Sequence, residues 1–332
     1  MKLVIPFLFL FISSFSQSIS RKSFFEDETV VSLAISVSLK NIDQPTQVDV
    51  KRPAMAKLVL ANDSAFTGPI QLHARGKSRL ALCDPPPLML YFKTKMPSQL
   101  SNLGKLKLVW ACNSSDYYDQ LILKEYIIYK MYNLLTPYSF RVRLANVGVY
   151  DSSKAGKTYN RMGFLIEDID DLAKRLNGKE FGDLVLQPGQ VEQYHYALVT
   201  IFEYMIANTD WSISNFQNIK MVSQGTIGSM PPILVPYDFD NSGLVNAIYA
   251  VPFETLPIDN VRTRYNRATS LSIGDIDSAS QVILSAKPAI ISLIENTEGL
   301  KLAQKKEMVN YLNEFFGLMD DKKAFNKIFL KQ

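Results

Sequence analysis

Cysteine and histidine are scarce in this chain of 332 residues, which contains two of each. Structural zinc sites bring Cys and His ligands together at short spacings, and neither pair shows such a spacing, so the composition argues against zinc. The two cysteines, Cys83 and Cys112, permit only one pairing. An oxidising compartment would favour a disulfide between them over two free thiols.

The chain also has no large excess of charge of either sign. Its 36 basic and 32 acidic residues leave a net charge of +4. This near balance provides no strong field for a polyanion, so we expect no nucleic-acid partner. The hydrophobic content of 47% is typical of a globular protein and is sufficient for one large two-lobed domain or two small ones.

Long apolar runs are missing, since no segment after the N-terminus approaches about 20 uninterrupted apolar residues. The N-terminus itself begins with a lysine, continues with an apolar run over residues 3–12 and ends in small residues, as secretory signals do. We therefore predict a signal peptide over residues 1–18, cleaved after Ser16 or Ser18. The mature protein should be extracytoplasmic, either periplasmic or secreted, without a stable membrane span. A retained N-terminal anchor is the alternative.

Periodicity divides the rest of the chain into a strand-rich part and a helix-rich part. Residues 19–50 are a polar N-terminal extension with one β-rich run at 30–37. Strands are predicted at residues 56–60, 69–74, 88–92, 106–110, 139–150 and 159–167, and helices at 117–135, 168–176, 191–207, 276–294 and 300–329. This order predicts an α+β, protein-kinase-like two-lobed fold. Its sheet-rich N-lobe, with one long helix, would cover residues 51–168, and its helix-rich C-lobe residues 169–332.

Two short motifs between the strands and the C-terminal helices indicate phosphoryl transfer. Asp210 follows a long apolar-periodic helix and precedes Asn215 by five residues, while Asp238 and Asp240 end an apolar, strand-like segment. In phosphoryl transfer the protein mainly positions groups and neutralises charge. Asp210 would orient the attacking hydroxyl, and Asn215 and Asp238 would bind magnesium, with Asp240 as a further ligand. The alternative is that these residues only form turns or helix caps.

The same chemistry requires a cation for the phosphates. Lys107 lies in a predicted strand, 18 residues before Glu125 in the next helix, a separation that suits a lysine and glutamate pair. Lys93 is the competing candidate. For either lysine the alternative is a solvated residue at a strand edge.

Two further segments are candidates for nucleotide contacts. Arg75 begins a basic glycine-containing turn over residues 75–79, which lacks the P-loop spacing but would offer amides and arginines to phosphates. Glu167 ends a predicted strand, at the position where a hinge would contact a nucleotide base. His73 and His195 are expected to be packed or surface residues. Serine nucleophile elbows and His-Glu-Xaa-Xaa-His motifs are absent from the sequence.

These motifs together resemble the spore-coat protein H (CotH) kinase family over roughly residues 65–250. The matching segments are Arg75-Gly76, Phe164-Leu165-Ile166-Glu167-Asp168-Ile169-Asp170, Asp210 with Asn215, and Pro236-Tyr237-Asp238-Phe239-Asp240. The resemblance implies a kinase-like fold, ATP with Mg²⁺ or Mn²⁺, and phosphorylation of serines in extracytoplasmic proteins. The residues around Asp210 also resemble the corresponding motif of HipA-type kinases. Two departures are Asn208-Thr209 in place of the usual His-Arg, and Asp-Phe-Asp in place of Asp-Phe-Gly.

The sequence therefore predicts a secreted ATP- and Mg²⁺-dependent phosphotransferase, with an exported protein or glycan as acceptor of the γ-phosphate on a Ser, Thr or other hydroxyl. One alternative is a non-catalytic pseudokinase or coat-type interaction protein. Another is a haloacid-dehalogenase-type phosphatase using Asp238 and Asp240, which requires a parallel α/β domain.

Overall fold

A computed structural model describes residues 19–76, 80, 83–96, 98–154, 156–182, 184–225, 228–252 and 255–330. The predicted signal peptide and residues 77–79 of the basic turn lie outside these ranges. The elements are, in chain order, α1 (Arg21–Glu26), β1 (Val31–Val37), η1 (Pro45–Gln47), β2 (Arg52–Val59), β3 (Ala65–Ala74), β4 (Leu88–Tyr91), η2 (Ser101–Leu103), β5 (Lys105–Trp110), α2 (Asp116–Leu135), β6 (Val142–Asp151), β7 (Thr158–Ile166), α3 (Ile169–Arg175), β8 (Gly178–Glu180), η3 (Pro188–Gln190), α4 (Gln193–Met205), β9 (Ile219–Gln224), β10 (Ile233–Pro236), α5 (Ile273–Asn296), α6 (Leu302–Leu318) and α7 (Lys322–Leu330).

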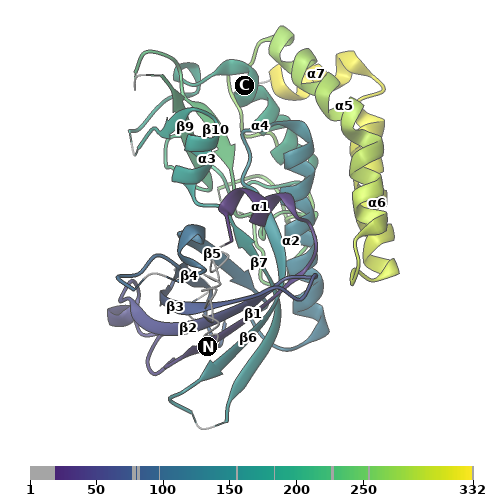
Figure 1. The fold of residues 1–332 in the computed structure, drawn as a ribbon. Coiled ribbons are helices and arrows are strands. Elements are labelled where there is room, and N and C mark those ends of the chain that lie inside the picture. Colours follow the sequence, from purple (N-terminus) through teal and green to yellow (C-terminus); the bar gives the residue numbers. More distant parts are fainter. Residues whose placement is uncertain are drawn as a thin grey trace, which may run out of the picture.

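Seven strands close into a barrel in the order β1-β2-β3-β4-β5-β7-β6, which forms the lower half of Figure 1. The pairings are antiparallel except that of β1 with β6, which is parallel and sets Val31 opposite Ala145. Strict alternation of buried and exposed residues along β1 directs its apolar side chains inward. The barrel interior is filled by such side chains, including Leu33, Leu58, Leu72, Leu90, Leu106 and Leu165.

The composition of helices and strands is mixed α+β, as predicted, but the prediction of a protein-kinase-like two-lobed fold is wrong. The strands form a closed barrel of mixed pairing, and the second part of the chain contributes a sheet of its own instead of a purely helical lobe. The barrel closes through β1, which lies in the segment interpreted as a polar extension. Because β1 pairs with β6 more than a hundred residues further on, local periodicity carries no information about this closure.

The second part of the chain is built around an antiparallel three-stranded sheet in the order β10-β9-β8, seen with α3 and α4 in the upper half of Figure 1. β9 and β10 pair antiparallel and form a hairpin. The long helix α2 lies between this part and the barrel. Its buried side chains join one core with α4, α5 and the outer faces of β5, β6 and β7.

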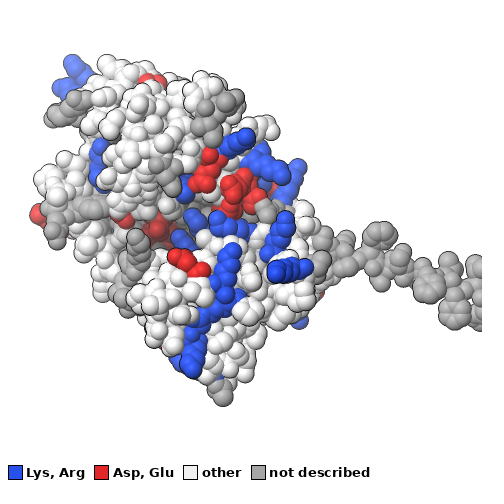
Figure 2. Space-filling view, turned by 90° about the vertical axis from the view of Figure 1, so that its left-hand side faces the viewer, with Lys and Arg blue, Asp and Glu red and all other residues white. Residues whose placement is uncertain are grey.

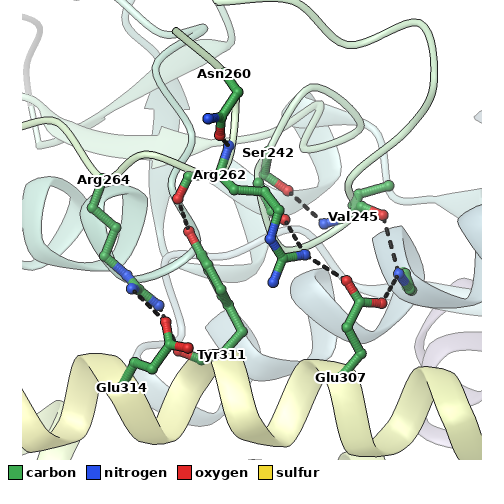
Figure 3. A network of polar contacts seen from close by, with 10 residues as sticks. Ser242, Val245, Asn260, Arg262, Arg264, Glu307, Tyr311 and Glu314 are labelled. Atoms are coloured by element: carbon green, nitrogen blue, oxygen red, sulfur yellow. Dashed lines mark hydrogen bonds and ion pairs between the residues drawn. The ribbon is translucent and has the colours of Figure 1, made fainter. Parts of the chain in front are cut away.

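A polar network fastens the C-terminal helix α6 to α2 and to the loop before α5 (Figure 3). Glu307 of α6 accepts hydrogen bonds from Lys124 of α2, at 2.8 Å, and from Arg262 of the loop. One turn further on, the hydroxyl of Tyr311 donates to the carbonyl oxygen of Arg262 at 2.7 Å. Helix α6 is therefore held against α2 and the loop before α5 by hydrogen bonds of its side chains.

Cys83 and Cys112 form a disulfide, which confirms the predicted pairing. The bond joins the segment before β4 to the segment after β5. Among the described residues, no helix is both long and apolar enough to cross a membrane.

Candidate active site

The centre of the candidate site is the loop that follows α4. The backbone N–H groups of Gly243 and Leu244 donate to the carbonyl oxygens of Ala207 and Ile206, both at 3.0 Å. A side chain at Gly243 would bring a Cβ within 2.8 Å of the Cα of Arg262, so only glycine permits this close crossing. The segment that follows β10 is thereby held beside the loop that carries Asp210.

Three side-chain amides hold the carboxylate of Asp210. Asn218 and Asn241 donate to Oδ2 at 3.0 and 3.1 Å, and Gln217 donates to Oδ1. A short antiparallel bridge between Ser212 and Gln217 turns the chain back on itself and brings Gln217 and Asn218 to Asp210, whereas Asn241 comes from the segment after β10. The orientation of the carboxylate is therefore fixed before any ligand binds.

The pKa of Asp210 is raised to about 6, mainly by burial; the charges of Asp238 and Asp240 contribute to this rise, and the hydrogen bonds from Asn241 and Asn218 oppose it. A general base is most effective when its pKa lies near the operating pH. Asp210 is ionised at neutral pH and is basic enough to accept a proton. This arrangement suits the role predicted for it.

Glu203 of α4 lies behind Asp210 and is fully buried. Burial raises the pKa of Glu203 well above its ordinary value, and the charge of Asp210 adds to this shift. Burial therefore disfavours the charged form of Glu203, and with it a second negative charge behind Asp210. Asn208 lies between them and accepts the N–H of Asp210 at 3.0 Å.

Asp238 directly follows Tyr237 at the end of β10 and has φ of 64°, in the left-handed region. Its N–H donates to the hydroxyl of Tyr129 in α2 at 2.9 Å. Phe239 is fully buried, with its ring centroid 4.8 Å from that of Tyr129, and Asp240 is buried as well. The Asp-Phe-Asp segment is thus anchored by its central ring and by the amide of its first residue.

Lys107, the predicted phosphate-binding cation, lies on β5 near Asp238. Leu106 and Leu108 of β5 point into the barrel, so Lys107 points out of it, where its Nζ lies 4.6 Å from the ring centroid of Tyr237. The pKa of Lys107 is lowered to about 8, mainly by burial; the charge of Arg75 contributes to this lowering and the charge of Asp238 opposes it. Lys93, the competing candidate, is exposed beyond the end of β4.

Two other predicted site residues lie near this group. The charge of Arg75 acts on Lys107, Tyr129 and Tyr237, so the described end of the basic turn belongs to the site. Glu125 is buried in α2, where its charge raises the pKa of Tyr129, after burial itself. The strongest charge effects on Lys107 come from other residues, and its pairing with Glu125 stays a prediction.

Glu167 is engaged in a contact of its own. Its buried carboxylate accepts hydrogen bonds from Nε and Nη2 of Arg175, at 3.2 and 3.0 Å, and from the N–H of Arg141 at 3.2 Å. Its side chain therefore stabilises the junction between β7 and α3. The contact with a nucleotide base that was predicted for Glu167 stays a prediction.

Asn215 is exposed, and its N–H donates to the hydroxyl oxygen of Ser212 at 3.3 Å. Within the loop after Asp210, the asparagine whose side chain donates to the Asp210 carboxylate is Asn218, which the motif spacing did not indicate. A signal for it exists, because Asn218 directly precedes the apolar strand β9 and is therefore fixed by that strand. The role of Asn215 as a magnesium ligand stays a prediction.

The donors of the site fit magnesium, which prefers carboxylate and amide oxygens. Within the described part of the chain, no three His, Cys, Asp or Glu side chains are grouped so as to hold a metal ion by themselves. Magnesium commonly uses only one or two carboxylates together with substrate phosphates. Asp238 and Asp240, whose charges already raise the pKa of Asp210, fit an ion that arrives with a nucleotide.

Figure 2 shows the face of the molecule on the side of β3, β4 and β9, where acidic and basic side chains gather close together across the middle. Lys105 of β5 and Asp168 at the start of α3 form an ion pair at 2.9 Å. This pair joins the barrel to the part of the chain that follows it.

Comparison with known proteins finds no family model that matches this chain and no curated protein that is similar to it in sequence. The resemblance to CotH and HipA-type kinases therefore rests on the motifs alone.

Proposed function

We propose that this protein is an ATP- and Mg²⁺-dependent phosphotransferase that transfers the γ-phosphoryl group to a hydroxyl of an extracytoplasmic acceptor, a protein or a glycan. The observation that carries the proposal is the carboxylate of Asp210, held by three amide donors beside two further carboxylates. The same chemistry can occur on unrelated folds, because function depends on the residues of the site. The absence of a protein-kinase-like fold therefore does not exclude phosphoryl transfer.

Asp210 supplies the base. The amides of Gln217, Asn218 and Asn241 hold its carboxylate in one orientation, so no reorganisation is needed when an acceptor hydroxyl binds. The hydroxyl proton passes to Asp210 as the oxygen forms its bond to phosphorus, and ADP departs with the electrons of the broken bond. With a pKa of about 6, Asp210 is ready to accept that proton at neutral pH.

Lys107 supplies the positive charge. Phosphate oxygens beside its ammonium group would be stabilised by direct ion pairing, strengthened by the low polarity that burial creates. A magnesium ion held by Asp238 and Asp240 would neutralise further phosphate charge when bound. Arg75 adds a second cation, close enough for its charge to lower the pKa of Lys107.

The phosphatase alternative has no support from the topology. It requires the strand before Asp238 to belong to a parallel sheet, whereas β10 pairs antiparallel with β9. The elements that follow within the described ranges are helices. A non-catalytic role remains the alternative that the experiment must separate from the proposal.

The test is phosphate transfer by the protein lacking residues 1–18, with ATP labelled at the γ-phosphate and Mg²⁺. Autophosphorylation and transfer to casein report catalysis, and calorimetry reports ATP binding. We expect Asp210→Asn to lose transfer by at least a hundredfold while it still binds ATP. Asp238→Asn should lose the Mg²⁺ dependence of ATP binding, and Lys107→Met should weaken ATP binding itself.

Asp63→Asn, in the exposed turn between β2 and β3, is the matched control. If the wild type transfers no phosphate, or transfers it as well without Asp210, the proposal is wrong. ATP binding without transfer in the wild type would favour the non-catalytic alternative.

A further inference from the structure

Asp238 adopts a backbone conformation that residues with a side chain rarely occupy. Its φ of 64° lies in the left-handed region, which most residues with a Cβ avoid and which Asp and Asn enter more readily than the others. A contact to the backbone of Asp238 would keep it in this one conformation and so fix the direction of its side chain.

The contact is the hydroxyl of Tyr129, which accepts the N–H of Asp238 at 2.9 Å. The tyrosine is 2% exposed, and its ring packs against Phe239 and Phe164, with centroid distances of 4.8 and 5.5 Å. Because Phe239 and Phe164 pack against the ring of Tyr129, the ring is held in place and its hydroxyl has a fixed position. The acceptor for the Asp238 amide is therefore rigid.

Helix α2 follows the segment after Asp238 along its length. Beyond Tyr129, the ammonium of Lys124 donates to the carbonyl oxygen of Val245 at 3.2 Å, and the N–H of Ile248 donates to the hydroxyl of Tyr117 at 2.8 Å. Three side chains of one helix thus hold residues 238–248. Lys124 also binds Glu307, which connects this arrangement to α6 (Figure 3).

The conformation of Asp238 matters because its carboxylate acts on Asp210 and on Lys107, the proposed base and the proposed phosphate-binding cation. Its charge raises the pKa of Asp210 and opposes the lowering of the pKa of Lys107. A change of φ at this residue would turn the carboxylate away from one or both.

We propose that Tyr129 is a positioning residue, whose hydroxyl locks Asp238 in the left-handed conformation that directs its carboxylate to the site. The catalytic consequence rests on the proposed function, whereas the lock itself is a property of the fold and is tested separately. Helix α2 thereby sets the geometry of a residue that is more than a hundred positions away in sequence.

Tyr129→Phe removes the hydroxyl and keeps the ring. Tyr132→Phe is the matched control, since Tyr132 lies one turn further along α2, is 1% exposed, and its hydroxyl has no hydrogen-bond partner among the described residues. Amide hydrogen exchange of peptides covering residues 236–240 measures the lock. We expect exchange at Asp238 to be slow in the wild type, about tenfold faster in Tyr129→Phe and unchanged in Tyr132→Phe.

Phosphate transfer measures the consequence. With Tyr129→Phe we expect kcat to fall about tenfold and the Mg²⁺ requirement to rise, while KM for ATP stays within about twofold. If the Tyr129 hydroxyl only stabilised the fold, Tyr129→Phe would not lower kcat selectively. It would instead speed amide hydrogen exchange throughout the protein. Tyr132→Phe should retain the wild-type kinetics.

Three results would overturn the inference: an unprotected Asp238 amide in the wild type, equal exchange in Tyr129→Phe and wild type, or equal acceleration in both variants. The first of these needs no variant, so it remains decisive if Tyr129→Phe folds poorly. If the wild type transfers no phosphate but the exchange results are as expected, the proposed function fails and the lock stands.

Discussion

Asn218 fixes both the side chain and the main chain of Asp210 with one amide group. Its Nδ2 lies 3.0 Å from Oδ2 of Asp210 and 2.6 Å from the backbone carbonyl oxygen of the same residue. Asn218 itself directly precedes β9, so the loop that carries Asp210 is connected rigidly to the β8–β10 sheet. Loss of this amide would remove one of the three donors to the carboxylate and the hydrogen bond to the main chain of Asp210.

We therefore expect Asn218→Ala to lower kcat about ten- to a hundredfold. Because a hydrogen bond to the ionised carboxylate is lost, the pKa of Asp210 should rise, and the acidic limb of the pH–rate profile should move to higher pH. Rates measured between pH 5 and 9 test both effects.

Asn215→Ala is the control for this variant, because Asn215 is exposed five residues after Asp210. It should leave the acidic limb unchanged. A larger effect of Asn215→Ala than of Asn218→Ala would restore the interpretation from motif spacing and contradict the structural one.

The two shifted pKa values define a pH window for activity. Asp210, with a pKa raised to about 6, is protonated below that pH and loses its function as a base, so kcat/KM should fall about tenfold per pH unit there. Lys107, with a pKa lowered to about 8, loses its charge above that pH, so ATP binding should weaken. The profile of kcat/KM should be bell-shaped between these values.

Lys107→Arg separates the two limbs. Arginine stays charged at all these pH values, so the basic limb should disappear while the acidic limb remains near pH 6. A basic limb that persists in this variant would assign it to another group.

The sequence was sufficient to predict individual helices and strands, but it did not predict that the strands close into a barrel. The helix at α2 and the strands β5 and β7 were predictable because each has its own hydrophobic period. The closure of the barrel depends on the parallel pairing of β1 with β6, a contact between distant segments. A strand with alternating burial has the same pattern in an open sheet and in a barrel, so the pattern left the topology undetermined.

The site shows the same division. Asp210, Asp238 and Lys107 were recognisable by residue type and by the elements that precede them, and the structure brings the charge of Asp238 within reach of both Asp210 and Lys107. Asn218 and Tyr129 were missed because their roles depend on contacts that only the folded chain creates. Tyr129, in particular, has the sequence pattern of an ordinary core residue.

The network around Glu307 gives a prediction about stability. Lys124 has a side chain that is 4% exposed, and Glu307 is its charged partner. Glu307→Gln would leave the buried ammonium without a counter-charge and should lower the free energy of unfolding by about 2 kcal/mol. Urea denaturation followed by circular dichroism measures this change.

Asp116→Asn is the matched control, since Asp116 forms an ion pair with Lys301 in which both side chains are more than half exposed. Exposed pairs contribute little, so this variant should change the free energy of unfolding by less than about 0.5 kcal/mol. Equal effects of the two substitutions would show that burial of Lys124 does not govern the contribution of the network.

The disulfide between Cys83 and Cys112 gives a prediction that applies to the first half of the chain. The bond closes a segment with a sequence separation of 29, which restricts the unfolded chain and should stabilise the native state by about 3 kcal/mol. The double variant Cys83→Ser/Cys112→Ser should therefore unfold at a lower urea concentration than the oxidised protein. Reduction of the wild type should shift its midpoint to the same value, because both treatments remove the same constraint. The shift should be absent when the variant itself is treated with reductant. An unchanged midpoint in the reduced wild type would mean that the bond contributes nothing to the stability of the barrel.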